Sequence, residues 1–464
     1  MRITPCGAVG EVTGSGYLLE TASASVLIDF GMFQGLTASP ERNARLGAVV
    51  PRKLDAVVLT HAHLDHCGRL PLLTRNGFRG RFFATPATID LTRIILEDSA
   101  RIQEGEARRA ARGARRSGHT PAEPLYDQDD VELTIHQFRS LAFERSRQIA
   151  PGVTARFFEA GHILGAASLE LTIDEGKGEK TVVFSGDVGP PGSPIIRDAI
   201  RPTRADMVFL ESTYGDRDHV SRIETVARFH DLLEQADRNK RRIIIPAFAI
   251  GRTQMLLYYI AQAVRENRIT MFPIYQDSPT GRRAGEVYAY HQHLYNEEAL
   301  ALAKNDQMNQ DLRNLRILLT PHESSQLNHS HESCVIISSS GMCEGGRIMH
   351  HLKHNLWRED VDLVMVGYMA EGTLGRQIKE GATEVLIHGE PVSIRCRVHV
   401  LSGLSAHAGQ TELLEWLEPV AGQHPRVVLT HGEDEQREAL RGKIIEKYGL
   451  DVECPEPGDV ITLE

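Results

Sequence analysis

The sequence predicts an α/β protein in which one domain is inserted into another. Strand-like segments with interspersed helices dominate the first 205 or so residues, and strands and helices alternate from about Asp206 onward. Such alternation favours a parallel sheet flanked by helices. The 464 residues exceed a typical single domain, yet they contain no internal repeat and no low-complexity linker. The absence of a linker favours an insertion over domains arranged one after another.

The first part of the chain is expected to consist mainly of short strands, because apolar runs there are bounded by polar residues. The expected strands are Gly16–Glu20, Ser25–Asp29, Ala56–Thr60, Arg81–Ala84, Ala155–Glu159, Ser168–Ile173 and Thr181–Ser185. Between them, a helix is expected from about Pro86 to Arg116, and Gly118 to Pro124 predict a loop.

The later part is expected to begin with a strand that is followed by an amphipathic helix. The expected strands are Met207–Glu211, Arg242–Pro246, Val335–Ser339, Asp362–Gly367, Val398–Ser402 and Arg426–Thr430, and the expected helices are Ile223–Asn239, Thr253–Glu266 and Thr411–Leu417. Short strands return after about Pro391. We therefore expect the outer domain at residues 1–205 and 390–464 and the inserted domain at residues 206–389.

The composition indicates a cytoplasmic protein. The start of the chain lacks a basic region followed by a long apolar run. No stretch approaches the roughly 18 uninterrupted apolar residues of a membrane span. The six cysteines are scattered without a CxxC pair, which favours reduced, buried thiols over zinc fingers. The oligomeric state stays open, with a homodimer as one option.

The net charge of −10 argues at first against nucleic acid, because phosphate binding favours a basic surface. Bound divalent cations would, however, supply positive charge at the cleavage site itself. In addition, six arginines crowd a stretch with only Glu104 and Glu106 against them: Arg101, Arg108, Arg109, Arg112, Arg115 and Arg116. This arginine cluster is either a solvated helix face or an edge that follows RNA. The charge balance therefore decides nothing about the partner.

The strongest motif is His61-Ala62-His63-Leu64-Asp65-His66, which directly follows an expected buried strand. Four ligand-type side chains within six residues can converge on one or two cations when they lie on a turn. Imidazole nitrogen and carboxylate oxygen both suit zinc. A histidine-rich surface loop is the alternative interpretation, but the preceding apolar strand favours a metal site.

This HxHxDH pattern and three further segments resemble the metallo-β-lactamase superfamily. Asp29 in Leu27-Ile28-Asp29-Phe30-Gly31 matches the first family motif, His162 in Ala160-Gly161-His162 the third, and Asp187 in Ser185-Gly186-Asp187 the fourth. The resemblance implies an αββα sandwich in which Asp29 supports the metal site. It also implies two Zn²⁺ per chain, one held by His61, His63 and His162, the other by Asp65, His66 and His431, with Asp187 bridging them.

Later segments resemble the β-CASP branch of this superfamily, which processes nucleic acids. Glu211-Ser212-Thr213-Tyr214-Gly215 is similar to motif A, Leu404-Ser405-Ala406-His407-Ala408 to motif B, and Leu429-Thr430-His431-Gly432 to motif C. The likeness is greatest to bacterial and archaeal relatives of the endonuclease subunit of the cleavage and polyadenylation specificity factor. The resemblance implies that a β-CASP α/β domain, a parallel sheet flanked by helices, is inserted into the sandwich.

The same resemblance implies roles for residues beyond the metal ligands. Two metals can share a hydroxide that attacks phosphorus in line. His407 would then protonate the leaving oxygen, and Glu211 would orient its imidazole; Asp65 and Asp29 complete the catalytic set. Glycine-rich segments would let backbone amides approach phosphates. The candidates for substrate binding are Ser340, Gly341, Arg252, Arg347 and Arg376.

We therefore expect a zinc-dependent ribonuclease that hydrolyses single-stranded RNA in RNA processing or decay. It would act as an endonuclease, and additional 5′-exonuclease activity stays open. A DNA-processing β-CASP nuclease is the main alternative, but such relatives typically carry valine where this chain has His431. A small-molecule metallo-hydrolase would not need the inserted domain. A non-catalytic scaffold would not need the complete ligand set.

Overall fold

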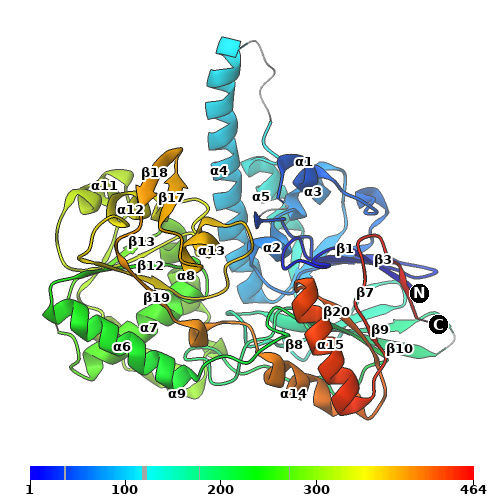
Figure 1. Cartoon of the computed structure of the whole chain (residues 1–464). Coiled ribbons are helices and arrows are strands. Elements are labelled where there is room, and N and C mark those ends of the chain that lie inside the picture. The colour runs from blue at the N-terminus through cyan, green and yellow to red at the C-terminus, as the bar shows by residue number, and fades with distance from the viewer. Residues whose placement is uncertain (36–37, 118–122, 177, 271, 464) are drawn as a thin grey trace. The chain divides into compact units, whose positions relative to one another are not determined.

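The chain forms two compact units, described by a computed structural model (Figure 1). Unit 1 comprises Met1–Pro191, Asp198–Asp218 and His407–Glu464, and unit 2 comprises Gly192–Arg197 and His219–Ala406. The structure describes residues 1–35, 38–117, 123–176, 178–270 and 272–463; for residues 112–117 it describes the helix but not the side chains. Unit 2 is thus an insertion in the chain of unit 1, as the sequence predicts.

Two seven-stranded sheets form the centre of unit 1. The first has the order β22-β1-β2-β3-β4-β5-β6, with β1 (Arg2–Gly7), β2 (Gly16–Glu20), β3 (Ser25–Ile28), β4 (Ala56–Val58), β5 (Arg81–Ala84), β6 (Phe138–Ser140) and β22 (Ile461–Thr462). The second has the order β21-β20-β11-β10-β9-β8-β7, with β7 (Arg147–Ala150), β8 (Val153–Glu159), β9 (Ala167–Asp174), β10 (Glu179–Phe184), β11 (Met207–Glu211), β20 (Arg426–Thr430) and β21 (Val452–Glu453).

Alternation of side chains along the strands explains why the sheets are covered on both faces. Leu19 and Phe209 belong to a core that both sheets share. Their chain neighbours Leu18 and Val208 face the opposite way, Leu18 toward α3, α4 and α5 and Val208 toward α14 and α15. Because each sheet buries one face against the other sheet and one against helices, unit 1 is an αββα sandwich. The expected fold class is confirmed.

The helices of unit 1 are α1 (Pro40–Ala44), α2 (Leu64–Cys67), α3 (Leu70–Arg75), α4 (Pro86–Ser117), α5 (Gln128–Gln137), α14 (Gln410–Ala421), α15 (Asp434–Tyr448) and the 3₁₀ helix η2 (Pro51–Lys53). Among the described residues, no helix of either unit has the length and apolarity that crossing a membrane requires.

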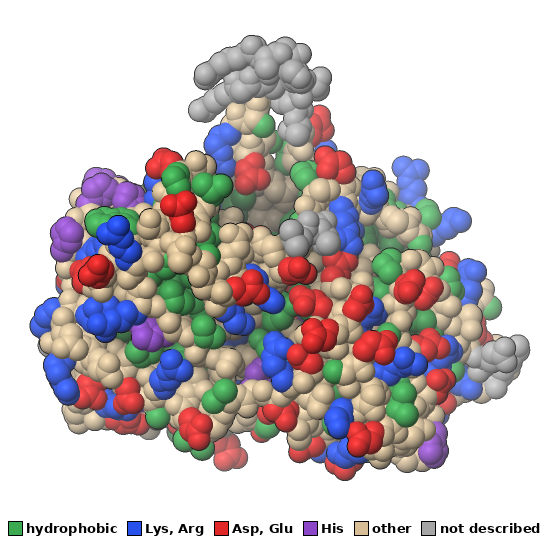
Figure 2. Space-filling view, in the orientation of Figure 1, with side chains coloured by type: hydrophobic (Ala, Val, Ile, Leu, Met, Phe, Trp, Pro, Cys, Tyr) green, Lys and Arg blue, Asp and Glu red, His purple; other side chains and the backbone are tan. Residues whose placement is uncertain are grey.

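The arginine cluster lies on α4, the long helix that extends away from the sheets of unit 1 (Figure 1). Arg101 pairs with Asp98 and Arg108 with Glu104 on the same helix. The side chains of Arg112, Arg115 and Arg116, and most of the loop expected after them, lie outside the described residues. Acidic and basic side chains are interspersed over the visible face of the molecule (Figure 2).

Unit 2 contains a six-stranded sheet of order β14-β13-β15-β12-β16-β19, in which every neighbouring pair is parallel, and a separate hairpin, β17–β18. The strands are β12 (Arg242–Pro246), β13 (Ile274–Asp277), β14 (Leu315–Ile317), β15 (Val335–Ser338), β16 (Val361–Met365), β17 (Glu384–Ile387), β18 (Glu390–Ser393) and β19 (Arg397–Val400). The helices are α6 (Arg222–Arg238), α7 (Arg252–Arg265), α8 (Pro279–Tyr290), α9 (Glu297–Lys304), α10 (Gln307–Asp311), α11 (Pro321–His329), α12 (Ile348–Asn355), α13 (Leu374–Lys379), η3 (Gln292–Leu294) and η4 (Ser402–Leu404).

The unit boundaries fall at other residues than the sequence suggests. Strand β11 pairs with β10 and β20, so residues 206–218 lie in unit 1 instead of in the insertion. Strand β19 pairs with β16, so residues 390–406 lie in unit 2. The sequence of one strand does not reveal which sheet it joins, because the pairing of strands depends on tertiary packing.

Candidate metal centre and active site

Loops at strand ends of unit 1 bring seven ligand-type side chains into one cluster. The loop between β4 and α2, α2 itself, the β8–β9 turn and the loops after β10 and β20 carry them. They are His61, His63, Asp65, His66, His162, Asp187 and His431. His63 and Asp65 are half-buried and the others are buried. All seven ligands expected from the motifs therefore lie together.

Four of these side chains form a first group with the spacing of a tetrahedral zinc site. His63 Nδ1 lies 3.2 Å from His61 Nε2 and 3.0 Å from His162 Nε2. Asp187 Oδ2 lies 3.3 Å from His61 Nε2 and 3.5 Å from His162 Nε2. Ligands about 2.0–2.1 Å from one tetrahedral zinc stand roughly 3.3 Å apart. The donor set and its spacing fit one zinc ion.

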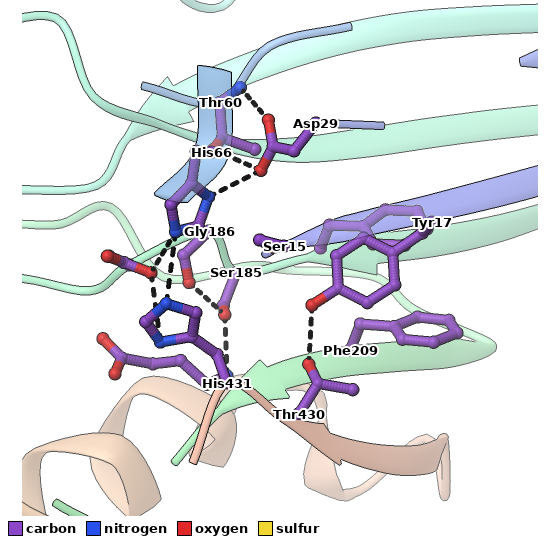
Figure 3. A pocket seen from close by; sticks show the side chains of 13 residues that line it. Ser15, Tyr17, Asp29, Thr60, His66, Ser185, Gly186, Phe209, Thr430 and His431 are labelled. Carbon is purple, nitrogen blue, oxygen red and sulfur yellow. Dashed lines mark hydrogen bonds and ion pairs between the residues drawn. The ribbon is translucent and has the colours of Figure 1, made fainter. Parts of the chain in front are cut away.

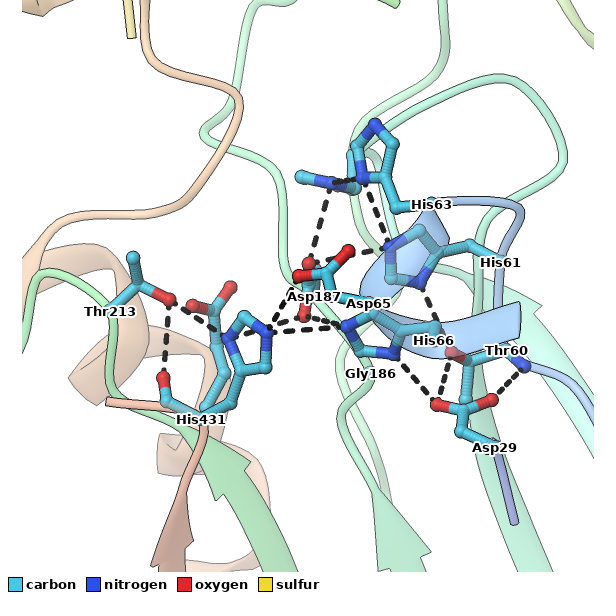
Figure 4. A network of polar contacts seen from close by, with 12 residues as sticks. Asp29, Thr60, His61, His63, Asp65, His66, Gly186, Asp187, Thr213 and His431 are labelled. Atoms are coloured by element: carbon cyan, nitrogen blue, oxygen red, sulfur yellow. Dashed lines mark hydrogen bonds and ion pairs between the residues drawn. The ribbon is translucent and has the colours of Figure 1, made fainter. Parts of the chain in front are cut away.

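A second group lies on the other side of Asp187. His66 Nε2 lies 3.2 Å from His431 Nε2, and Asp65 Oδ2 lies 3.6 Å from His431 Nε2. The other carboxylate oxygen, Asp187 Oδ1, lies 3.3 Å from His66 Nε2. Asp187 thus turns one oxygen to each group, as a bridging ligand would (Figure 4).

Burial keeps the histidines of the first group in the form that binds metal. It lowers the pKa of His61 to about 3 and that of His63 to about 4, and it lowers the pKa of His162 well below its usual value. The neutral imidazole is the form that donates its lone pair to a cation. At neutral pH these three nitrogens are therefore ready to bind a metal ion.

Three further side chains orient the histidines (Figure 4). Asp29 Oδ2 accepts from His66 Nδ1 at 2.8 Å and from Thr60 Oγ at 2.8 Å. His61 Nδ1 lies 3.1 Å from Thr60 Oγ, and His431 Nδ1 lies 3.1 Å from Thr213 Oγ. Each contact occupies Nδ1 and turns Nε2 toward the metal site, which fixes the tautomer.

Asp29 therefore contacts a histidine of the second group. Thr60 and Thr213, which also contact histidines, are not among the residues expected from the sequence. The sequence around the metal-binding motifs does contain a signal that could have identified Thr60. A metal-binding histidine usually donates its second ring N–H to an oxygen, and Thr60 directly precedes His61. Asp29 and His431 both have positive φ angles, 54° and 51°. Aspartate and histidine adopt this conformation more often than most other non-glycine residues.

The expected proton donor and its partner meet beside the first group. His407 Nδ1 lies 3.2 Å from Glu211 Oε2 and 3.9 Å from Asp187 Oδ2. The Glu211 carboxylate is held in turn, because its Oε1 accepts from the amide of Val188 at 2.7 Å. The backbone of Glu211 donates to Ser185 Oγ at 3.0 Å. The structure therefore brings both residues together as the sequence predicts.

A small pocket is lined by His66 and His431 and also by Tyr17 and Thr430 (Figure 3). The Tyr17 hydroxyl and Thr430 Oγ lie 2.8 Å apart. Burial raises the pKa of Tyr17 well above its usual value, so this hydroxyl stays neutral. The contact joins β2 of the first sheet to β20 of the second, next to the residue that follows β20, His431.

The candidate substrate-binding residues lie in loops and helix starts that follow three parallel strands of unit 2. They are Arg252 after β12, Ser340 and Gly341 after β15, and Arg376 after β16, with Arg347 at the start of α12. The loops after β15 and β16 are in contact, since the amide of Gly375 donates to the carbonyl of Met342 at 3.0 Å. Ligands of open parallel sheets bind at this carboxyl edge.

The three arginines differ in their partners. Arg252 is buried. Arg347 Nη1 donates to Asp277 Oδ1 at 2.6 Å, and its side chain is 19% exposed. Arg376 Nε donates to Glu380 Oε1 at 2.5 Å, and its side chain is 33% exposed. Arg376 is the most accessible of the three guanidinium groups.

Family comparisons match three segments of the chain. The metallo-β-lactamase superfamily matches residues 9–78, the Beta-Casp domain matches residues 253–378, and the Zn-dependent metallo-hydrolase RNA specificity domain matches residues 391–455. The first match contains the HxHxDH motif, and the last contains His407 and His431. A His/Asp cluster in a Zn-dependent hydrolase family supports metal binding at this site.

Whole-length relatives agree with these matches. Ribonuclease TTHA0252 of Thermus thermophilus is 38% identical over 463 residues, which cover 100% of both chains. Transcription termination factor FttA of Pyrococcus horikoshii is 30% identical over 480 residues, which cover 100% of this chain and 71% of that one. A crystal structure of a protein of unknown function from Enterococcus faecalis V583 shares the fold, with a TM-score of 0.54 at 11% identity over 100% of this chain and 99% of that one. The chain therefore belongs to the β-CASP family of the metallo-β-lactamase superfamily.

Proposed function

We propose that the chain is a zinc-dependent ribonuclease that hydrolyses phosphodiester bonds of single-stranded RNA as an endonuclease. The observation that carries this proposal is the orientation of the Asp187 carboxylate, whose two oxygens face two groups of ligand-type atoms. Two metals in such an arrangement can clamp the attacking and the leaving oxygen of a phosphodiester. The match to an RNA specificity domain and the ribonuclease name of a relative support RNA as the substrate.

Two zinc ions per chain are part of this proposal. The first would be held by His61, His63, His162 and Asp187, and the second by Asp65, His66, His431 and Asp187. When bound, the ions would activate water and neutralise charge on the phosphate. The contacts of Asp29, Thr60 and Thr213 keep the imidazoles in the tautomer that this requires.

His407 would donate the proton that the leaving oxygen needs. Its Nδ1 faces Glu211, so Nε2 is the nitrogen that would deliver the proton. The carboxylate favours the imidazolium form, and the Val188 amide keeps that carboxylate in place. His407 and Glu211 thus act as one unit in this proposal, with His407 as the group that touches substrate.

Unit 2 would bind phosphates of the RNA other than the one that is cut. The carboxyl-edge loops that carry Ser340, Gly341 and Arg376 support this, because glycine-rich turns let backbone amides approach an anion. The electrostatic part of such binding is independent of base sequence. Specificity would then come from the path of the RNA strand over the protein and from contacts to the ribose.

Cleavage of labelled oligonucleotides tests the proposal. The purified protein, with zinc present, is mixed with single-stranded RNA that carries either a 5′ label or internal labels, and product lengths are read over time. We expect products of internal cuts. Products that have lost single nucleotides from the 5′ end would show exonuclease activity as well. His407→Ala controls for contaminating nucleases. Intact RNA with a protein that contains two zinc ions would refute the ribonuclease assignment.

A further inference from the structure

A buried carboxylate at the carboxyl edge of the unit 2 sheet accepts hydrogen bonds from two helices. Asp277 is the last residue of β13 and is fully buried. Its Oδ1 accepts from Arg347 Nη1 at 2.6 Å. Its Oδ2 contacts His351 Nε2 at 2.7 Å and accepts from Ser324 Oγ at 2.5 Å. Arg347 is the N-cap residue of α12 and His351 lies within the helix, so this one carboxylate contacts the start of α12 twice.

Asp277 and the next residue, Ser278, also contact the segment that runs from the end of β15 to α12. The backbone carbonyl of Asp277 accepts from Ser338 Oγ at 3.0 Å. Ser339 Oγ donates to Ser278 Oγ at 2.9 Å. We call residues 339–346 the glycine-rich loop. Asp277 and Ser278 contact the chain at the start of this loop, and Asp277 contacts Arg347 directly after its end.

Between these two ends the glycine-rich loop has a defined shape. Ser340 Oγ accepts from the amide of Glu344 at 3.1 Å, and the amide of Ser340 donates to the carbonyl of Gly345 at 3.2 Å. A Cβ atom at Gly341 would lie 2.7 Å from the Phe248 ring, so the backbone passes that ring at close range. Such a compact turn depends on its two ends staying at a fixed separation.

The Arg347 guanidinium donates its hydrogen bonds to groups inside unit 2. Besides Asp277, its guanidinium donates to the carbonyl of Leu318 at 3.1 Å and to that of Leu319 at 2.9 Å. Burial alone would raise the pKa of Asp277, but hydrogen bonds from His351, Ser324 and Arg347 lower it, so the group is a carboxylate at neutral pH. The Arg347–Asp277 contact is therefore a charge-assisted pair, the stronger kind of hydrogen bond.

We propose that Asp277 is a positioning residue for RNA binding. Its carboxylate anchors the end of the glycine-rich loop through Arg347 and His351, and its backbone carbonyl anchors the start through Ser338. Arg347 belongs to this anchor and does not contact RNA phosphate. The inference rests on the proposed function, since the anchor affects catalysis only if the glycine-rich loop contacts RNA. Loosening the anchor would shift the loop amides relative to the phosphate that they approach.

The chain offers a matched control at the opposite edge of the same sheet. Asp362, the second residue of β16, is 5% exposed. Its Oδ2 accepts from Arg241 Nε at 2.5 Å, and its Oδ1 contacts His399 Nε2 at 2.9 Å. Asp362→Asn therefore disturbs a buried Asp–Arg–His set of the same chemistry, but at the amino edge of the sheet, away from the glycine-rich loop.

The reactivity of two buried thiols measures, in the absence of RNA, how well Asp277 holds the glycine-rich loop. Cys343 lies in the glycine-rich loop and Cys334 directly precedes β15; both are fully buried. The native protein is treated with iodoacetamide, and labelling of each thiol is read by mass spectrometry. Asp277→Asn should raise the Cys343-to-Cys334 labelling ratio roughly tenfold, because losing a charge-assisted hydrogen bond shifts a local opening equilibrium by about that factor. Asp362→Asn should not raise it.

RNA kinetics on the zinc-loaded protein then test the consequence. Asp277→Asn should raise the KM for RNA on the order of 10-fold to 100-fold, as the loss of a hydrogen bond to a charged phosphate can do, with kcat and zinc content close to wild type. Asp362→Asn should leave the KM unchanged. Ser324→Ala, which removes one hydrogen bond and keeps the charges, should shift both readouts in the same direction but less, and it serves if Asp277→Asn does not fold.

The outcomes separate the two proposals. If the wild type does not cut RNA, the proposed function fails, and the thiol ratio still decides whether Asp277 anchors the loop. A wild-type labelling ratio in both Asp277→Asn and Ser324→Ala would overturn the anchor. A raised ratio with an unchanged KM, or an equal rise of KM in Asp277→Asn and Asp362→Asn, would overturn the role in RNA binding.

Discussion

His407 Nδ1 lies 3.2 Å from Oε2 and 3.3 Å from Oε1 of Glu211, although 196 residues separate them in the sequence. Burial alone would lower the pKa of His407, but the negative charges of Glu211 and Asp187 outweigh burial and raise it. The pair thus favours the protonated imidazole, which is the form that a proton donor requires.

His407→Ala should reduce RNA cleavage by roughly 10²–10⁴-fold, the usual contribution of a positioned acid. Zinc content should stay nearly unchanged, because His63 and His162 complete the first group without His407. Glu211→Gln should have a similar effect, and the double variant should be little worse than either, since residues that act as one unit are non-additive. Single-turnover rates and elemental analysis measure these effects.

His63→Ala is the matched comparison, because it should lose both zinc and activity. If His407→Ala loses zinc to the same extent as His63→Ala, His407 is a metal ligand and its assignment as the proton donor is wrong. If the fold-reductions in cleavage rate of the two single variants multiply in the double variant, Glu211 and His407 act independently and not as one unit.

Replacing Asp29 should weaken zinc binding although Asp29 belongs to neither group of ligands. Its carboxylate fixes His66 Nδ1 at 2.8 Å, and loss of such a contact typically costs about 10–100-fold in metal affinity. Asp29→Asn should therefore retain less than the two zinc ions expected of the wild type after dialysis against a weak chelator. Asp55→Asn, which removes a carboxylate that accepts from the Ser25 amide on the same sheet, is the control. Equal zinc retention by all three proteins would contradict the role of Asp29.

Much of the site could be predicted because its ligands occur in short, ordered motifs. Four of the seven lie within residues 61–66, and the loop that carries them follows a strand that the apolar run at Ala56–Thr60 predicts. Strands Arg81–Ala84, Met207–Glu211, Arg242–Pro246 and Arg426–Thr430 have the expected bounds. Local patterns predict these elements because the middle of each strand is a buried apolar run that polar residues or a proline border.

Asp277 carries no comparable signal, and it was not predicted. In the sequence it is an aspartate at the end of a short strand, and its partners Ser324, Arg347 and His351 lie 47, 70 and 74 residues away. The glycines around Arg347 suggest a phosphate contact for its guanidinium, and only the packed structure reveals the internal carboxylate. Contacts between side chains from different helices depend on tertiary packing, which local sequence patterns do not specify.

The Asp277 carboxylate should make stability depend on pH in one direction. Because its folded-state pKa is lowered, it stabilises the fold above the unfolded pKa of about 3.9, and this contribution is lost as the pH falls through the folded-state pKa. Asp277→Asn should destabilise the protein by roughly 3 kcal/mol at neutral pH, since it breaks a buried charged pair. The difference in melting temperature from wild type should shrink below about pH 4. A constant difference from pH 7 to pH 3 would contradict this.

Arg376 and Arg347 should differ in the salt dependence of RNA binding. Arg376 is the more exposed of the two, so Arg376→Gln should reduce the slope of log Kd against log salt by about one unit. Arg347→Gln should weaken binding through the glycine-rich loop and leave the slope unchanged, because its guanidinium is bound to Asp277, Leu318 and Leu319. Fluorescence anisotropy with a labelled RNA in the His407→Ala background gives both slopes. A slope that falls only for Arg347→Gln would reverse the two roles.

His431 should be required for the second zinc ion and, through it, for cleavage of RNA. Its Nε2 lies 3.2 Å from His66 Nε2, and Thr213 occupies its Nδ1. His431→Val removes one nitrogen from the second group, so zinc content should fall toward one per chain and the cleavage rate should fall with it. The wild type should cut single-stranded RNA much faster than DNA of the same sequence, because the 2′-hydroxyl can donate and accept where deoxyribose offers no such group. Matched oligonucleotides at one salt concentration, with zinc present, measure this ratio. Equal rates on RNA and DNA would refute the RNA preference and leave the two-metal phosphodiesterase in place, whereas full activity of His431→Val would remove the second metal from the mechanism.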